Sequence, residues 1–355
     1  MKVLYIGDKI IKAQSGADQV NMRNQILLEN IADIKYIEIK GRDGLKIYLS
    51  VSDELLKEIE VELKRESYDF VFIQQSTLGR ACAYIKKRFP QVKILLFFHN
   101  IELQYAEEYL KTNGLRAIPF YLAVKYWEKK ACKFADKFIT LNSRDNCLLQ
   151  KKYNKKSDLS LPTSMVDNYN DELALFFERL ILDGRNDEID YLFVGVAFFA
   201  NIEGIQWFID NVFPYVNGNL YIVGKGMDKV QFKNINKRVY IYGFVDDLSD
   251  FYYRARIVIS PINVGGGMKT KTAEALMYGK TIVGTSEAFE GYELDQKCTF
   301  VCNTSKEFID TIRQLNNDSR FIINKNARTL FLKFYESSVI SKKLSEFLIK
   351  ENKSL

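Results

Sequence analysis

The sequence predicts an α/β protein of two domains, each built as a doubly wound parallel sheet. Three observations support this fold class. Short β-rich runs alternate with amphipathic segments of helical periodicity, which is the pattern of βαβ units. The alternation occurs in two separate series along the chain. The chain has 355 residues, 47% of them hydrophobic, so it is too long for one ordinary core and long enough for two.

The first series begins with the strand VLYIG, a helix over residues 19–30 and the strand IKYIEI. A helix over 53–65 then leads to FVFIQQ, and a helix over 80–88 leads to VKILLFFHN. A long helical stretch reaches residue 134 and precedes the strand DKFITLNS. Because ligands bind outside the carboxyl ends of the strands in such sheets, the residues after VLYIG and VKILLFF are candidate binding positions.

The second series contains the strands DYLFVG, NLYIVG, VYIYGF, IVISPI, TIVGT and TFVC. Helices are expected over 202–212, 247–254 and 306–315, with another that starts near residue 268 or 269. The connecting segment contains the helix DELALFFERLILDG, and the chain ends in an amphipathic helix over 327–352. We therefore expect domains over 1–165 and 166–335, with residues 336–355 packing back on the first, and a cleft between the two.

Composition excludes several classes of function. Lys and Arg total 51 against 45 Asp and Glu, a formal charge of +6. This mild excess argues against a nucleic-acid binder and suits anionic ligands or an anionic membrane surface. His99 is the one histidine, and no CxxC pair occurs among the cysteines, which are Cys82, Cys132, Cys147, Cys298 and Cys302. A zinc site is therefore not expected.

Targeting signals are not apparent in the sequence. The start has no signal-peptide pattern, and no stretch approaches the roughly 20 apolar residues of a spanning helix. We expect a cytoplasmic protein with reduced thiols, in which any membrane contact, for instance with the inner face of the membrane, is peripheral. The segment FYLAVKYWEKKACKFADKF mixes aromatic residues with lysines and could lie on an anionic bilayer. We prefer to interpret it as a surface helix whose aromatic side packs on the sheet.

The stretch SPINVGGGMKTKTAEALMYGKTIVGT, residues 260–285, carries the strongest chemical signal. Glycines after a buried strand let backbone N–H groups approach a ligand, and the helix start that follows adds partial positive charge. Lys269 and Lys271 add full charges that could neutralise a diphosphate, and Glu274 could accept two ribose hydroxyls. The alternative is a flexible loop with a solvated Glu274. The IVGKG turn lacks the third glycine of a dinucleotide fingerprint, so a nicotinamide enzyme is disfavoured.

The same stretch is similar to the donor-binding signature of the family 4 (group 1) retaining glycosyltransferases, of the bacterial surface-polysaccharide type. LFVGVAFFANIEGIQWFIDNVFPYV, LYIVGKGM and YGFVDDLSDFYYRARIVISPI resemble further ordered blocks of that family, and SGADQVNMRNQ, FFHNIE and FITLNSRDN resemble it more sparsely. The resemblance implies the GT-B fold, in which two Rossmann-like domains face an interdomain cleft. It also implies a donor nucleotide bound on the second domain.

The resemblance assigns roles to individual residues. Glu274 matches the glutamate that holds the nucleotide ribose, and His99 matches the histidine beside the donor sugar. Gly16 matches the glycine turn that closes on the diphosphate. Residues facing the base match Gly243, Phe244 and Val245, and residues facing the sugar and distal phosphate match Gly266, Gly267, Met268, Lys269 and Thr270.

Two departures from the family pattern stand out. The first glutamate of the family's pair would fall at Gly266, so the carboxylate that touches the sugar is missing. The lysine expected after the second domain's first strand is replaced, with Asn201 in that area. Lys225, Lys269 or Lys271 would supply the phosphate charge instead, and we favour Lys271, although helix phase could make Lys269 the inward residue.

The resemblance implies a retaining transfer of a hexose-type sugar from a nucleoside diphosphate, most readily UDP, to a hydroxyl of a glycan, lipid-linked glycan or protein-linked acceptor. Same-face attack, in which a donor phosphate oxygen takes the acceptor proton, would need no protein base. Neither a metal nor a cofactor beyond the nucleotide sugar is implied. An alternative is a catalytically silent GT-B subunit that serves as partner or scaffold of another transferase, and a GT-B epimerase is a weaker one.

Overall fold

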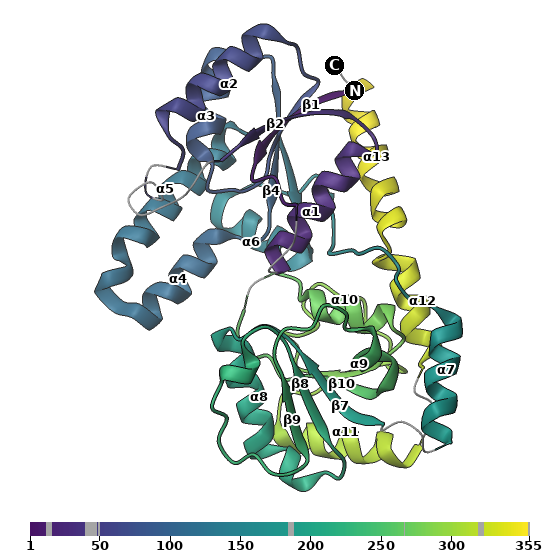
Figure 1. The fold of residues 1–355 in the computed structure, drawn as a ribbon. Coiled ribbons are helices and arrows are strands. Elements are labelled where there is room, and N and C mark those ends of the chain that lie inside the picture. Colours follow the sequence, from purple (N-terminus) through teal and green to yellow (C-terminus); the bar gives the residue numbers. More distant parts are fainter. Residues whose placement is uncertain are drawn as a thin grey trace. The chain divides into compact units, whose positions relative to one another are not determined.

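The computed structural model describes residues 1–11, 16–39, 48, 50–183, 188–265, 267–318 and 323–353. The chain divides into two compact units, residues 1–162 with 340–355, and residues 163–339, where the sequence analysis expected boundaries near 165 and 335. Each unit is a parallel sheet flanked by helices (Figure 1). Among the described residues, every helix is too short or too polar to cross a bilayer.

The first unit contains a six-stranded parallel sheet with the strand order β2-β1-β3-β4-β5-β6. Its strands are β1 (Lys2–Gly7), β2 (Asp33–Glu38), β3 (Phe70–Ile73), β4 (Lys93–Phe98), β5 (Lys137–Thr140) and β6 (Leu159–Ser160). Its helices are α1 (Gly16–Glu29), α2 (Asp53–Arg65), α3 (Gly79–Arg88), α4 (Glu102–Asn113), α5 (Ile118–Phe134) and α6 (Ser143–Tyr153), with a 3₁₀ turn, η2 (Gly114–Ala117), between α4 and α5.

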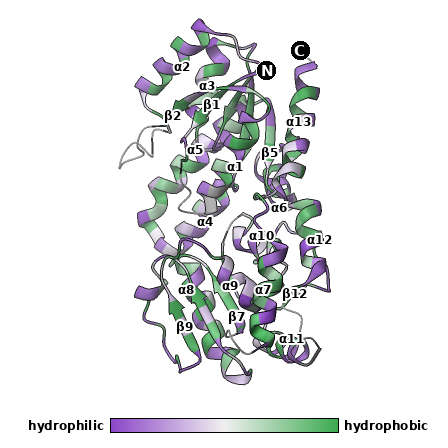
Figure 2. Ribbon diagram, turned by 45° about the vertical axis from the view of Figure 1, so that its right-hand side comes forward, coloured by the Kyte–Doolittle hydropathy of each residue, from purple (hydrophilic) through white to green (hydrophobic). Residues whose placement is uncertain are grey.

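The two faces of this sheet are covered differently. In Figure 1, α2, α3 and α5 lie on one side and α1 on the other. Because side chains alternate along a strand, Leu4 and Ile6 pack toward the first group of helices. Tyr5 points to the opposite face and stacks on Phe72, with ring centroids 5.3 Å apart. Figure 2 shows largely hydrophobic strands between helices of mixed character, as expected for a sheet buried on both faces.

The second unit contains a six-stranded parallel sheet with the order β12-β11-β10-β7-β8-β9. Its strands are β7 (Ile189–Val194), β8 (Leu220–Val223), β9 (Val239–Tyr242), β10 (Ala255–Ser260), β11 (Thr281–Gly284) and β12 (Thr299–Val301). Its helices are α7 (Asp171–Leu182), α8 (Phe199–Asn211), α9 (Ser249–Arg254), α10 (Thr270–Met277), α11 (Ser305–Asp318) and α12 (Lys325–Phe334), with 3₁₀ turns η3 (Phe213–Tyr215) and η4 (Met227–Lys229).

Each sheet reverses its winding direction at one point. In the first sheet the strand order reverses between β1 and β3, and in the second it reverses between β7 and β10. At such a switch point the connections leave in opposite directions and open a crevice outside the carboxyl ends of the two strands. The two parallel sheets confirm the predicted fold class and direct attention to the residues after these four strands.

Two predicted helices are each broken, one by a glycine within it and the other by pairing with a distant segment. The stretch up to Phe134 divides into α4 and α5 at Gly114, whose φ of +62° strongly disfavours other residues. The last predicted helix divides into α12 and α13 (Ser337–Lys353). There the N–H of Met165 donates to the carbonyl of Tyr335, and the N–H of Ser337 donates to the carbonyl of Met165. A neighbouring segment thus takes the backbone groups that a continuous helix would need.

The aromatic helix packs on the first unit through part of its aromatic side, since Tyr121 and Phe134 are partly buried against the core. The fully buried residues of α5 are Val124, Glu128, Ala131 and Cys132, so smaller side chains and one carboxylate form the deepest part of its inward face. Tyr126 is exposed and Trp127 lies at an intermediate position. The close approach of α3 explains this choice, because a methyl group on Gly79 would lie 1.9 Å from the carbonyl oxygen of Trp127. Bulky side chains cannot point inward at such a contact.

Candidate functional site

Lys271 occupies the switch point of the second sheet. It lies in the first turn of α10, and its Nζ is 2.6 Å from Oδ1 of Asn201 and 4.4 Å from the ring centre of Phe193. Asn201 in turn donates to the carbonyl of Val196, just after β7, at 2.8 Å. A methyl group on Gly195 would lie 3.1 Å from the lysine Nζ. A bare glycine therefore lets this ammonium group reach the end of β7.

The charge of Lys271 has little to balance it. No acidic side chain among the described residues forms an ion pair with it. Burial, with the neighbouring charge of Lys269 acting in the same direction, lowers its pKa to about 7. An anion beside the ammonium would reverse this shift, since an opposite charge favours the protonated form. The site is thus electrostatically prepared for an anionic ligand.

Lys269 is engaged differently. It is the N-cap residue of α10, and its Nζ lies 2.7 Å from Oε1 of Glu287 and donates to the carbonyl of Gly267 at 3.0 Å. Its own carbonyl accepts a hydrogen bond from the hydroxyl of Tyr292 at 2.7 Å. Lys269 therefore holds the glycine loop to the turn after β11, whereas Lys271 is the lysine that reaches the switch point.

Glu274 is held by one buried partner. The hydroxyl of Tyr252 donates to its Oε2 at 2.9 Å, and the ring of Tyr252 stacks on Tyr278 with centroids 4.8 Å apart at 8°. Burial raises the pKa of Glu274 to about 7, although the tyrosine hydrogen bond opposes the shift. Because Tyr252 is fully buried, the orientation of this carboxylate is fixed by the core.

The remaining predicted donor residues of this unit follow other strands at the same sheet edge. Lys225 is exposed in the turn after β8, and its carbonyl accepts from the N–H of Ala197. Gly243 directly follows β9 and lies against the side chain of Asp228. A methyl group on Gly243 would lie 2.6 Å from the Asp228 carboxylate. Phe244 is 63% exposed. Further members of the set are Val245, the buried Met268, and Thr270 at the start of α10, while Gly266 lies outside the described residues.

Two predicted residues belong to the first unit. His99 directly follows β4, with its ring 4.9 Å from that of Phe97, and Gly16 is the first residue of α1. Both ring nitrogens of His99 are buried, and neither makes a hydrogen bond of normal geometry. Burial lowers the pKa of His99 to about 3, and the charge of Arg23 acts in the same direction. The imidazole is therefore neutral at physiological pH.

Glu128 anchors the loop that carries His99. Its buried carboxylate accepts the N–H groups of Glu102 and Leu103 at the start of α4, at 2.8 and 3.1 Å. It also accepts the hydroxyls of Ser76, after β3, and Tyr153, at the end of α6, both at 2.7 Å. Burial raises the pKa of Glu128, while these four donors act against the shift. One side chain thus joins three chain segments around the histidine.

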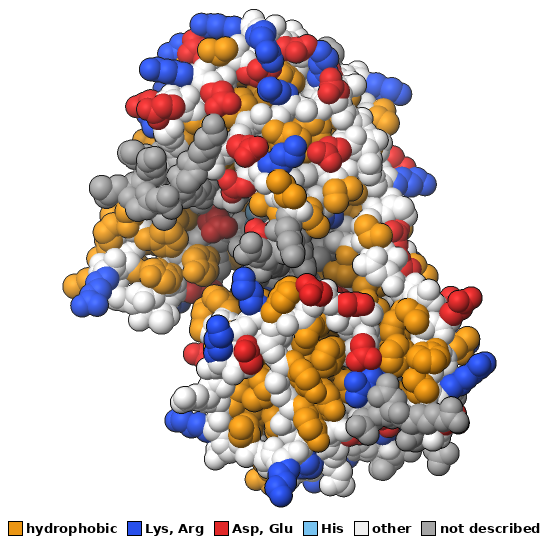
Figure 3. Space-filling view, viewed as in Figure 1, with side chains coloured by type: hydrophobic (Ala, Val, Ile, Leu, Met, Phe, Trp, Pro, Cys, Tyr) orange, Lys and Arg blue, Asp and Glu red, His pale blue; other side chains and the backbone are white. Residues whose placement is uncertain are grey.

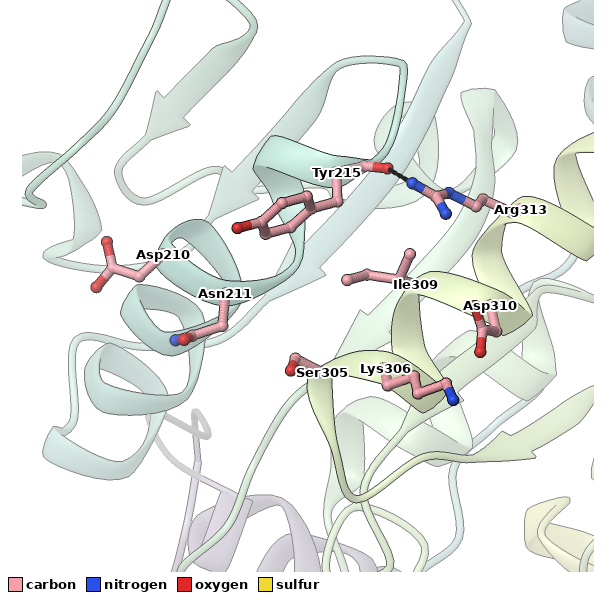
Figure 4. Close-up of a pocket in the computed structure, with 8 residues that line it drawn as sticks. All are labelled: Asp210, Asn211, Tyr215, Ser305, Lys306, Ile309, Asp310 and Arg313. Carbon is pink, nitrogen blue, oxygen red and sulfur yellow. Dashed lines mark hydrogen bonds between the residues drawn. The ribbon is translucent and has the colours of Figure 1, made fainter.

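Two surface pockets lie elsewhere in the second unit. One, of about 430 Å³, is lined by the end of α8, by Tyr215 and by one side of α11, where Arg313 donates to the carbonyl of Tyr215 (Figure 4). The other, of about 400 Å³, lies along α8. None of the predicted donor residues lines either pocket. Within the described residues, no group of three or more His, Cys, Asp or Glu side chains could hold a metal ion.

Comparisons with known proteins give one family match and several similar structures. Residues 188–318 match the family model described as glycosyl transferases, group 1, and no curated protein matches the sequence. The structure is similar to Anabaena Alr3699/HepE in complex with UDP, with a TM-score of 0.69 and 14% identity over 99% of this chain and 100% of that one. The structure is also similar to a glycosyltransferase from Rickettsia africae. The TM-score is 0.67 and the sequence identity 13%, and the match covers 100% of this chain and 99% of that one.

A third similar structure is the apo form of the lipopolysaccharide outer core galactosyltransferase WaaB. Its TM-score is 0.68 at 12% identity, with 99% of this chain and 100% of that chain covered. At this level of identity the likeness establishes the fold, which is GT-B. The family match confirms the predicted resemblance for the second unit.

Several residues of these sites were not predicted. Tyr252 and Glu128 are ordinary members of apolar helical patterns in the sequence, and Glu287 lies in a turn with no motif. Arg23 lies within SGADQVNMRNQ but was given no role. The available signal was position alone, since the segments after β1, β3 and β11 all reach the carboxyl edge of a sheet.

The Glu128 carboxylate should be a major source of stability in the first unit. We expect Glu128→Gln to lower the free energy of unfolding by about 2–3 kcal/mol. The neutral amide loses the charge-assisted hydrogen bonds, and its NH₂ group cannot accept from the donors that surround it. Glu107→Gln, which removes a partly exposed pairing with Lys152, should cost less than about 1 kcal/mol. Urea unfolding of both variants measures the difference, and equal costs would contradict the assigned role.

Proposed function

We propose that this chain, whose residues 188–318 form a group 1 glycosyltransferase domain, transfers a hexose-type sugar from a nucleoside diphosphate to a hydroxyl. The acceptor would be a glycan, a lipid-linked glycan or a protein-linked acceptor, and the anomeric configuration would be retained. The observation that carries this proposal is the half-buried ammonium of Lys271 at the amino end of α10, which has no carboxylate partner among the described residues. UDP is the favoured nucleotide because Alr3699/HepE is described in complex with UDP and with UDP-glucose.

The diphosphate is proposed to bind at the amino end of α10. The first turn of a helix leaves backbone N–H groups without intrahelical partners and carries partial positive charge. Lys271 adds a full charge at the same point. As the bond to the sugar breaks, negative charge builds up on the leaving diphosphate, so this arrangement stabilises the transition state more than the ground state. Glu274, held by Tyr252, would accept the ribose hydroxyls.

The sugar is proposed to react by same-face attack, with a donor phosphate oxygen taking the acceptor proton. His99 is neutral at physiological pH, as its lowered pKa indicates, so it would bind a sugar hydroxyl rather than carry charge. Metal-independent transfer is part of the proposal, since Lys271 and α10 can balance the diphosphate charge. The nucleotide sugar is then a substrate, and no further cofactor is needed.

Glu287 is proposed to replace the carboxylate that the glycine loop lacks. The resemblance puts a sugar-binding glutamate at position 266, where this chain has glycine. Glu287 reaches the same loop from the turn after β11, through Lys269, and its Oε1 would lie 3.8 Å from a methyl group on Gly265. A carboxylate beside the loop can accept a sugar hydroxyl as one within it would. If Glu287 supplies the carboxylate that the loop lacks, the site favours an active transferase over a silent scaffold subunit.

Peripheral contact with an anionic membrane, at its cytoplasmic face, is proposed through α4 and α5. This aromatic–basic surface has the exposed apolar residues Tyr105, Tyr109, Leu115, Leu122 and Tyr126, and Figure 3 shows apolar side chains gathered over the two helices. The exposed basic residues of the same helices include Lys111, Lys125, Lys129 and Lys133. Aromatic rings with interleaved lysines suit the headgroup region of an anionic bilayer.

Nucleotide binding tests the donor site. We expect UDP to bind the full chain and Glu274→Ala and Lys271→Met to weaken it by at least about tenfold, because each removes a charge-assisted contact. Lys306→Met, in the pocket of Figure 4, is the matched control and should leave UDP affinity unchanged.

Glu287→Gln should weaken the binding of UDP-glucose but not that of UDP. Calorimetry measures all four, and absent UDP binding at millimolar ligand would overturn the proposal. Released UDP with acceptor present separates an active enzyme from a scaffold.

The pH dependence of UDP affinity should be bell-shaped, with its maximum near pH 7. Glu274 must lose a proton to accept ribose hydroxyls, and its pKa is raised to about 7, so affinity falls below that pH. Lys271 must hold a proton to pair with the diphosphate, and its pKa is lowered to about 7, so affinity falls above it. Glu274→Gln should remove the acid limb and Lys271→Met the alkaline limb, relative to the nucleotide's own titration. Unchanged profiles would refute both assignments.

Membrane binding is measurable by co-sedimentation with vesicles. We expect binding to phosphatidylglycerol-containing vesicles, weak binding to phosphatidylcholine alone, and a decrease with salt, because each lysine near the surface contributes about 1 kcal/mol. Lys125→Glu with Lys129→Glu should reduce binding at least tenfold, while Lys306→Glu in the second unit should have little effect. Equal binding of both variants would argue against this surface.

A further inference from the structure

A group of buried polar side chains lies on the α1 side of the first sheet, and apart from His99 none of them has been given a role in the donor site. We call Asn21, Arg23, Asn24, Gln74 and His99 the α1 polar cluster. Each is buried or, for His99, has both ring nitrogens buried, and each has at least one polar atom without a hydrogen-bond partner. Such groups are rarely left unpaired in folded proteins, so the cluster calls for an explanation.

Arg23 is the central residue of this cluster. Its side chain is only 6% exposed, and its Nη1 donates to the carbonyl of Pro162 at 2.7 Å. The other two positions, Nε and Nη2, are buried and have no partner, and no carboxylate among the described residues pairs with the guanidinium. Burial lowers the pKa of Arg23 to about 9, so the group remains charged at neutral pH. An unpaired buried charge is costly unless something supplies the opposite charge.

The unpartnered atoms of Arg23 have a specific geometry. Nε and Nη2 form one edge of the planar guanidinium, and this edge matches the two oxygens of a carboxylate or phosphate. The remaining free atoms are Oδ1 of Asn21, both amide atoms of Asn24, Nε2 of Gln74 and the ring nitrogens of His99. These donors and acceptors suit hydroxyl groups that accompany an anion. The chemistry is that of an acidic or phosphorylated sugar.

The cluster lies where a doubly wound sheet binds ligands. Gln74 follows β3, its Oε1 accepts the N–H of Asp8 after β1, and His99 follows β4. These are the carboxyl ends on either side of the β1/β3 switch point. The charges of Arg23 and Asp18 act on the pKa of His99 in opposite directions, so His99 lies within electrostatic reach of both side chains. His99 and Asn100 are partly exposed, so the buried atoms of the cluster lie beneath residues that border the surface at this edge.

We propose that the α1 polar cluster binds an oxyanion, carboxylate or phosphate, carried by the sugar acceptor, with the Nε and Nη2 edge of Arg23 as its bidentate partner. The identification of the ligand as the acceptor rests on the proposed transferase function. The donor diphosphate already has its own charge partner in Lys271 on the other unit. The acceptor would then be an acidic or phosphorylated glycan rather than a neutral one.

Calorimetry with the full chain tests this proposal. The probes are glucuronate, its neutral methyl ester, glucose 1-phosphate and glucose, each titrated with and without saturating UDP. We expect glucuronate and glucose 1-phosphate to bind at least about tenfold more tightly than the two neutral sugars, with UDP present or absent. This comparison needs no variant. Equal binding of charged and neutral sugars, or no binding of either, would mean that ordered water alone occupies the cluster and would overturn the proposal.

Variants then assign the anion site to Arg23. Arg23→Lys keeps the charge but removes the fork, and should weaken glucuronate at least about tenfold while UDP affinity stays within twofold. Arg88→Lys, at an exposed position, is the matched control. Arg23→Met should abolish the preference for charged sugars without lowering Tm, since it removes an unpaired buried charge. A loss of UDP affinity instead would assign Arg23 to the donor, and a lowered Tm with unchanged sugar binding would make it structural.

UDP binding separates this inference from the proposed function. If UDP binds and the charged sugars do not, the transferase proposal stands and the acceptor subsite is wrong. If charged sugars bind through Arg23 and UDP does not, the first unit has an anion site but the donor assignment fails.

Discussion

The constraint on which the structure depends is the parallel arrangement of both sheets. Every strand must be followed by a crossover, so all strands of a sheet end at one edge, and a single reversal of winding opens a crevice there. Residues far apart in sequence are collected at that edge: Asn201 after β7 and Lys271 after β10 in the second unit, and Gln74 after β3 and His99 after β4 in the first. The candidate binding residues therefore gather near the switch points, whereas the side chains inside the sheets contribute to packing.

Buried charges in this protein fall into two kinds according to their partners. Glu128 accepts four hydrogen bonds, and Lys280 donates to the carbonyl of Ala255 at the opposite, amino-terminal end of β10. Such satisfied charges connect chain segments. Lys271, at a switch point, is half-buried and Arg23 is buried, yet neither has a carboxylate partner among the described residues. An unsatisfied charge reduces stability unless a ligand completes it, which is why these two residues carry the functional proposals.

The fold, and the gathering of the candidate donor residues at one sheet edge, could be predicted from the sequence because their signals are local. Strand composition, helical periodicity and the glycines before Lys269 are each readable within one segment. The sequence did not show the features that a distant segment decides. The break at Tyr335 depends on pairing with Met165, and the inward face of α5 depends on contact with Gly79. Arg23 and Glu128 were not predicted for the same reason. An arginine or glutamate in a helix is normally solvated, and only the tertiary structure shows these two to be buried.

The position of Glu287 bears on how a transferase could function without the glutamate expected at 266. Lys269 connects this carboxylate to the glycine loop, with one ion pair to Glu287 and one hydrogen bond to Gly267. In the proposed mechanism a diphosphate at the start of α10 would compete with Glu287 for Lys269. Nucleotide binding would then change the surroundings of Glu287, the carboxylate proposed to bind the sugar. Sugar recognition would thus be coupled to nucleotide binding through Lys269, a coupling that a glutamate built into the loop would not require.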